Sequence, residues 1–224
     1  MLKKIVLSPF FMPVFFLILW LSLVGAVYGF YAGDLLALTK DGRFIDVIAK
    51  IGYIFLIFVL ALCYRDFQDK MLAWGCYIFL AMSCFLRESG IQHFLSETDS
   101  TPFKSRFFLN PDNPVHEKII FGAVLLLVFG AIIYLAMQYT KPLIKSFFKL
   151  DTITWGIATL CTTGVFSKII DRFPSNYRKA HHGEHLPDDV YAFLQILEET
   201  SEMFLPYLAM FVIFQYHLMC HHKK

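Results

Sequence analysis

The chain has 224 residues, of which 57% are hydrophobic, and its mean hydropathy is +0.57. A composition this apolar, gathered into long runs, excludes an ordinary soluble domain and predicts one membrane-embedded domain over residues 1–224. The formal net charge is +2, and no basic patch is interleaved with aromatic residues, so the sequence does not indicate nucleic-acid binding.

Six segments approach the roughly 20 apolar residues that a transmembrane helix needs. The sequence therefore predicts an all-α fold, a polytopic membrane helical bundle of about six transmembrane helices in contact with the lipid bilayer. The expected spans are residues 9–31, 45–64, 71–86, 119–139, 152–170 and 203–219.

The placement of lysine and arginine predicts the orientation. The first span follows Lys3 and Lys4, and its apolar run is longer than the roughly 7–15 residues of a signal-peptide core, so we interpret it as an uncleaved span. On the side shared with Lys3 and Lys4, the connections 65–70 and 140–151 are short and dense in Lys and Arg. The positive-inside rule therefore predicts an N-in, C-in topology.

On this topology the five cysteines lie in or beside spans or at the inner end of the last span. The sequence thus implies no exported disulfide framework, and we interpret these residues as small packing side chains. They are Cys63, Cys76, Cys84, Cys161 and Cys220.

The connection 87–118, between the third and fourth spans, is polar at both ends. Arg87, Glu88 and His93 follow the third span, and His116, Glu117 and Lys118 precede the fourth. Between them, the run Asn110-Pro111-Asp112-Asn113-Pro114 predicts a turn, because each proline fixes its own φ and restricts the residue before it.

The fifth span has a small, polar face. Gly156, Thr159, Thr163 and Ser167 recur at spacings of three and four, which favours close packing against another helix. Lys168, Asp171 and Arg172 lie at the outer end of the span, and the run 173–176, which contains Pro174, is expected to break the helix.

The last helix is expected to begin near Pro187 and to continue into the sixth span. A polar stripe at helical spacing runs along its first half: Asp188, Tyr191, Gln195, Glu198 and Glu202. Glu199 lies one step to the side, so the three glutamates project within roughly 120° of arc. Carboxylates at the mouth of a span are costly unless water, a cation or a metal receives them, which makes them candidate functional residues.

These residues together predict one charged layer at the outer boundary of the membrane. Its candidate members are Arg87, Glu88, His93, His116, Glu117, Asp171, Arg172, Glu198, Glu199 and Glu202. Ion pairing explains such a layer without any ligand, and Lys168 or Arg172 is expected opposite the glutamates.

The same layer also admits two chemical functions. Glutamates and histidines can hold Zn²⁺ or another divalent metal that activates water, and the candidate ligands are Glu198, Glu202, His93 and His116. Alternatively, the acids can bind a cation or relay protons. The sequence identifies no catalytic residue and no cofactor.

Two further groups of histidines stand outside this layer. His181, His182 and His185 form a tract that resembles a metal site by composition, although a solvated loop explains it as well. His217 and His221 are four residues apart and can present two ligands on one helix face, while a basic cytoplasmic tail explains them equally well.

Three short motifs carry a resemblance to a known group. Leu86-Arg87-Glu88, Glu117-Lys118 and the EExxE pattern at 198–202 occur in an order that resembles uncharacterised bacterial multi-pass inner-membrane proteins with LRE, EK and EExxE segments. The resemblance covers the chain from about the third span to the end. It implies a bacterial inner-membrane location and no particular activity.

We therefore expect an integral membrane protein of unknown activity whose charged layer is structural or binds a cation or a partner. One alternative is a metal-dependent membrane hydrolase acting on a lipid or a peptide, and another is a small ion- or proton-coupled transporter. A role as a subunit of a larger membrane complex is also consistent with the sequence, which has no sizeable soluble insertion.

Overall fold

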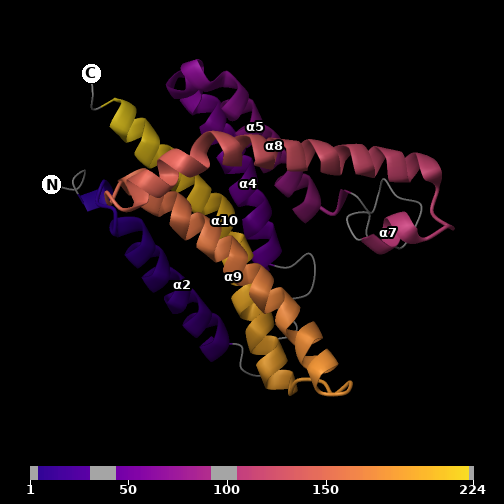
Figure 1. Cartoon of the computed structure of the whole chain (residues 1–224). Helices are drawn as coiled ribbons and strands as arrows, with labels where there is room; N and C mark the ends of the chain where they lie inside the picture. The colour runs from indigo at the N-terminus through magenta and orange to yellow at the C-terminus, as the bar shows by residue number, and fades with distance from the viewer. Residues whose placement is uncertain (1–4, 31–43, 92–104, 222–224) are drawn as a thin grey trace.

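A computed structural model describes residues 5–30, 44–91 and 105–221, and these residues form an arrangement of helices (Figure 1). The helices are α2 (Phe11–Phe30), α4 (Phe44–Leu62), the 3-10 helix η1 (Cys63–Lys70), α5 (Met71–Glu88), α7 (Ser105–Leu109), α8 (Val115–Phe147), α9 (Thr152–Ala180) and α10 (Asp188–Cys220). The predicted all-α fold is confirmed.

Among the described residues, five helical segments are long and apolar enough to cross a membrane. They are Phe11–Gly29, Ile45–Glu88, Val115–Phe147, Thr152–Ala180 and Asp188–Cys220. The second of these contains α4, η1 and α5, and α4 turns back through η1 to pack beside α5 (Figure 1). The five segments therefore hold the six predicted spans, and the chain is an integral membrane protein built as a helical bundle.

Helix α10 is the centre of the bundle. It packs against α9, α4 and α2. Ile196 is fully buried and lies in a cluster with Val24 of α2, whereas Leu208 packs with Met12. Helix α8 instead exposes large apolar side chains such as Leu126 and Met137, a surface suited to lipid.

Small residues and hydrogen bonds hold the central helices together. This is expected in a membrane, because lipid tails are as apolar as leucine side chains and burial of apolar surface does not drive helices together there. A Cβ atom added to Gly156 would lie 3.0 Å from Val212 Cγ2, so α9 and α10 approach closely at the predicted small face. On the same face Ser167 is fully buried. Trp20 Nε1 of α2 donates a 3.1 Å hydrogen bond to the buried Thr200 hydroxyl of α10.

The start of the described chain, η1, the beginning of α9 and the end of α10 meet at one end of the bundle (Figure 1). Thr152 Oγ1 donates to the Leu7 carbonyl oxygen at 2.5 Å, and Gln215 Nε2 donates to the Val6 carbonyl oxygen at 2.8 Å. This shared end agrees with the prediction that the two chain ends lie on one side of the membrane.

The expected helix break at Pro174 is wrong, because α9 continues through this residue to Ala180. Proline interrupts one backbone hydrogen bond, but its fixed φ suits a helix, and packing against a neighbouring helix can outweigh the cost. Helix α9 ends instead where His182 and Gly183 adopt positive φ angles of 51° and 99°. The Gly183 amide donates back to the Arg178 carbonyl oxygen at 2.9 Å, in the manner of a glycine-terminated helix.

Helix α10 begins at Asp188, as predicted, and its 33 residues correspond to about 50 Å of helix. A membrane's hydrocarbon core is only about 30 Å thick. The first turns of α10 and the last turns of α9 therefore extend together beyond the apolar part of the bundle, and the candidates Asp171, Glu198 and Glu199 lie between them.

Candidate functional site

Glu202 is the point at which three helices meet. Its Oε1 atom accepts a 3.0 Å hydrogen bond from Ser167 Oγ and lies 2.5 Å from Lys168 Nζ, both on α9. Its Oε2 atom lies 3.6 Å from Arg87 Nη2 at the end of α5. We call Glu202, Ser167, Lys168 and Arg87 the Glu202 junction.

Two more carboxylates surround this junction. Arg87 Nη2 lies 2.6 Å from Glu88 Oε1, and Lys168 Nζ lies 3.8 Å from Asp171 Oδ2. The network thus joins three carboxylates to two cations. Among the charged groups of the network the two glutamates are the best shielded, with 18% of the Glu202 side chain and 19% of the Glu88 side chain exposed against 52% for Lys168. The arrangement accounts for the Glu202 charge by pairing, and it links α5, α9 and α10.

A cavity of about 670 Å³ lies next to the junction, between the last turns of α9 and the first turns of α10. Helix α9 and the turn after it contribute Ile170, Asp171, Pro174, Ser175, Arg178, His185 and Leu186. Helix α10 contributes Asp188, Tyr191, Leu194, Gln195, Glu198 and Glu199. We call this space the α9–α10 cavity.

The lining of the α9–α10 cavity combines acidic and apolar side chains. It contains four carboxylates, those of Asp171, Asp188, Glu198 and Glu199, against one guanidinium, Arg178, and one imidazole, His185. The apolar walls come from Ile170, Pro174, Leu186 and Leu194, and Tyr191 adds an aromatic ring. Such a lining favours a ligand that carries both positive charge and apolar groups.

Comparison of the chain with protein-family models, with curated proteins and with solved structures gives no match. The resemblance to LRE, EK and EExxE membrane proteins therefore stays a prediction.

The structure brings together most of the predicted charged layer, but in two groups. Arg87, Glu88, Asp171 and Glu202 belong to the ionic network, with Lys168 in the position expected for a partner of the glutamates. Glu198 and Glu199 line the α9–α10 cavity, where Asp171 lies between the two groups.

The other candidates lie elsewhere. His116 and Glu117 begin α8 beside the predicted turn, in which Asn110 Oδ1 accepts from the Asp112 amide at 3.2 Å. Figure 1 shows this end of α8 beside α7, away from the α9–α10 turn. Arg172 is exposed on α9. His93 lies outside the described residues.

The predicted zinc ligands do not converge at this end in the part of the chain that the structure describes. Glu202 is held by Lys168 and Ser167, whereas Glu198 lines the cavity and His116 begins α8. Among residues 5–30, 44–91 and 105–221, the one group of three or more His, Cys, Asp or Glu ligand atoms within 4.8 Å of one another lies at the opposite end of the bundle.

Apart from Asp171, the sequence interpretation missed the polar residues of the α9 wall of the cavity. Asp171, Ser175 and Arg178 follow one another at spacings of four and three, which places them on one face of a continuous helix. The expected break at Pro174 hid this periodicity. Continuing the Thr163–Ser167 stripe through the proline would have found Ser175 and Arg178 as well.

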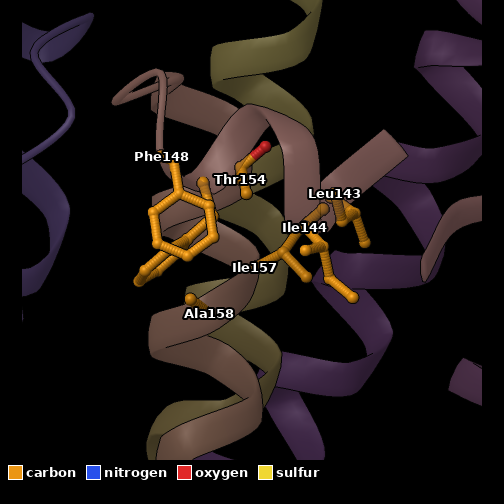
Figure 2. A pocket seen from close by; sticks show the side chains of 7 residues that line it. Leu143, Ile144, Phe148, Thr154, Ile157 and Ala158 are labelled. Carbon is orange, nitrogen blue, oxygen red and sulfur yellow. The ribbon is translucent and has the colours of Figure 1, made fainter. Parts of the chain in front are cut away.

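A second cavity, of about 340 Å³, lies in the turn between α8 and α9 (Figure 2). It is lined by Leu143, Ile144, Phe147, Phe148, Thr154, Ile157 and Ala158. Figure 2 shows the Thr154 hydroxyl directed away from Ile157 and Ala158, and this hydroxyl donates to Asp151 Oδ2 at 2.9 Å. The lining therefore offers no polar group that would orient a ligand, and the α9–α10 cavity is the better candidate site.

Proposed function

We propose that this integral membrane protein binds an organic cation in the α9–α10 cavity, while the Glu202 junction holds the surrounding helices in place. The observation that carries the proposal is the composition of the lining, which contains four carboxylates but only one guanidinium and one imidazole. The excess of negative charge favours a positively charged ligand.

The volume and the walls support an organic cation over a bare metal ion. Ligand-binding pockets typically enclose about 300–1,000 Å³, and this cavity of about 670 Å³ lies within that range. Leu194 and Leu186 can contact alkyl groups, and the Tyr191 ring can attract a quaternary ammonium through a cation–π interaction. Glu198 and Asp188 supply the opposing charge.

The proposal also includes the side of the membrane on which the cavity opens and the cellular membrane that holds the protein. Arg65, Lys70, Lys141, Lys145 and Lys149 belong to η1 or lie near the α8–α9 turn. The positive-inside rule supports a cytoplasmic position for that end, so the α9–α10 cavity opens on the outer side. Together with the resemblance noted above, this supports a bacterial inner membrane as the location.

The metal-dependent hydrolase and the ion- or proton-coupled transporter stay predictions, as does membership of a larger complex. The transporter would use the same acids to receive a cation during transport, so it is compatible with binding in the cavity. The hydrolase would need a metal and a bound water at the outer end.

A calorimetric titration of the purified protein tests the proposal. The protein is kept in an uncharged maltoside detergent, because a cationic detergent would compete with the ligand for the carboxylates of the cavity. It is titrated with tetraethylammonium and, separately, with Mg²⁺. We expect tetraethylammonium to bind, and Glu198→Gln to weaken binding about tenfold, which corresponds to about 1.4 kcal/mol.

Asp112→Asn is the matched control, because it removes an exposed carboxylate that does not line the cavity. It should leave the affinity unchanged. Equal affinity in the wild type and Glu198→Gln, or binding of Mg²⁺ without tetraethylammonium, would contradict an organic-cation site in this cavity.

A further inference from the structure

A separate group of ligand-type side chains lies at the opposite end of the bundle. Asp66 of η1 uses both carboxylate oxygens toward α10: Oδ2 lies 2.5 Å from His217 Nδ1, and Oδ1 lies 3.4 Å from His221 Nε2. The Cys63 thiol, the Asp66 carboxylate and the His217 imidazole place ligand atoms within 4.8 Å of one another. Residues from two elements about 150 positions apart in the sequence thus meet.

The local geometry of each element explains this convergence. In a 3-10 helix, side chains three residues apart eclipse each other, so Cys63 and Asp66 face the same way from η1. In an α-helix, side chains four residues apart share a face, and His221, which follows α10 directly in a helical conformation, has its ring centroid 4.4 Å from that of His217. Two pairs of potential ligands therefore face each other across the contact between η1 and α10.

We propose that Cys63, Asp66, His217 and His221 bind a divalent transition-metal ion, for which Zn²⁺ is the best match. Thiolate sulfur, imidazole nitrogen and carboxylate oxygen are the ligands that zinc takes, usually four in a tetrahedron. A mixed nitrogen and sulfur set disfavours Mg²⁺ and Ca²⁺, which prefer oxygen ligands alone.

The spacing is close to what a tetrahedral site requires. With metal–ligand bonds of about 2.0–2.3 Å, neighbouring ligand atoms lie about 3.5 Å apart. The ligand atoms of Cys63, Asp66 and His217 already lie within 4.8 Å of one another, so side-chain rotations suffice to close them on an ion. The Asp66–His217 contact would lengthen, the Cys63 thiol would lose its proton to solvent, and the metal would take their place as the bridge.

The site is reachable, and its central ligand is shielded. Only 7% of the Asp66 side chain is exposed, whereas 39% of His217 and 54% of His221 are exposed. An ion can therefore enter from the histidine side and be held against the buried carboxylate. Bound metal would fasten the last turn of α10 to η1 and thus to the α4–α5 hairpin.

The competing explanation is a simple ion pair between Asp66 and His217, with the histidines belonging to a basic tail. The two explanations differ in the role of Cys63, because an ion pair does not need a thiol. They also differ in stoichiometry, because only a metal site binds one equivalent of zinc.

The test measures zinc and cobalt binding to the full chain, purified with an affinity tag that contains no histidine. After dialysis against a chelator, the protein is dialysed against Zn²⁺ at several free concentrations, and bound zinc is measured by elemental mass spectrometry. We expect about one zinc per chain in the wild type, and at least about 100-fold weaker binding in Asp66→Asn and His217→Gln, since even residues that only support ligands cost 10–100-fold.

The matched control replaces His181, His182 and His185 together by Gln, which removes the other histidine-rich segment and should leave one zinc bound. Co²⁺ provides a readout that does not depend on affinity. The wild type should show a thiolate-to-cobalt charge-transfer absorption that Cys63→Ser abolishes and Cys220→Ser retains. Absence of stoichiometric zinc in the wild type, unchanged zinc binding in Asp66→Asn, or a charge-transfer band that survives in Cys63→Ser would overturn the proposal.

Discussion

Glu198 and Glu202 lie one turn apart on α10, yet their carboxylates have different surroundings. Glu202 accepts a hydrogen bond from Ser167 and contacts Lys168 and Arg87, so its charge is compensated within the protein. Glu198 lines the α9–α10 cavity with three other carboxylates. One acidic run therefore supplies both a structural ionic junction and a candidate binding surface.

Neutralising Glu202 should destabilise the bundle. Glu202→Gln removes the charge that Lys168 and Arg87 face, and hydrogen bonds to charged groups contribute about 1.5–3 kcal/mol each. We expect a loss of about 2 kcal/mol in the free energy of unfolding, measured by denaturant titration in detergent. The exposed Glu184 offers the control, because Glu184→Gln should change stability by less than about 0.5 kcal/mol. Equal stabilities of the two variants would contradict a junction at Glu202.

Pairings at the residue scale were predictable from sequence only where two spans had a fixed order. Lys168 ends the fifth span on the side where the sixth begins, so its contact with Glu202 followed from the topology. The contact of His217 with Asp66 joins residues 151 positions apart, and the spacing of His217 and His221 gave no hint of a partner in η1. Tertiary packing, which short motifs do not record, decides such pairs.

At the scale of elements, local sequence signals predicted the start of α10 but not the end of α9. The start of α10 after Pro187 followed from the proline and the two acids behind it. The end of α9 did not follow from Pro174, because a proline penalty is local whereas the compensation comes from the helix beside it. Helix α9 ends instead at residues 182 and 183, which adopt left-handed backbone conformations, and glycine, present at position 183, is the residue type that such a conformation favours.

Two glycines in the α4–α5 hairpin should respond in opposite ways to the same substitution. A Cβ on Gly52 would lie 2.8 Å from both Pro206 Cγ and Tyr207 Cε2, so Gly52→Ala must displace rigid rings on α10 and strain the Tyr207 hydrogen bond to the Ile48 carbonyl oxygen. We expect a loss of about 1–3 kcal/mol in unfolding free energy.

Gly75 supplies the matched control, since an added Cβ there has no neighbour within 4 Å. Gly75→Ala should raise stability by up to about 1 kcal/mol through helix propensity alone. Thermal unfolding of the two variants side by side measures the difference. A Gly52→Ala variant as stable as Gly75→Ala would show that α4 and α10 are not in close contact.

For the whole molecule, the sequence predicted the bundle because apolar runs of membrane length are an unambiguous signal. It did not predict that the two ends of the bundle carry different candidate sites. One end carries the Cys63, Asp66, His217 and His221 group, and the other carries the acidic cavity. The placement of these two groups depends on which helices pack beside α10, and hydropathy does not determine which helices are neighbours.

Cysteine accessibility tests the orientation of the two ends. In a variant without native cysteines, Asp69→Cys reports on η1 and Asn176→Cys on the exposed last turns of α9. We expect a membrane-impermeant maleimide added to intact cells to label Asn176→Cys but not Asp69→Cys, because Lys and Arg near η1 favour the cytoplasm. Lysed cells should label both. The reverse pattern in intact cells would place the acidic cavity inside.

The central claim is that an organic cation binds among the carboxylates of the α9–α10 cavity, and a protection experiment tests it most directly. Dicyclohexylcarbodiimide leaves a stable adduct on accessible carboxyl groups, and peptide mass spectrometry locates each adduct. With saturating tetraethylammonium, we expect modification of Asp188, Glu198 and Glu199 to fall several-fold, while that of Asp112 stays the same. Undiminished modification of the three cavity residues at saturating cation would contradict the claim.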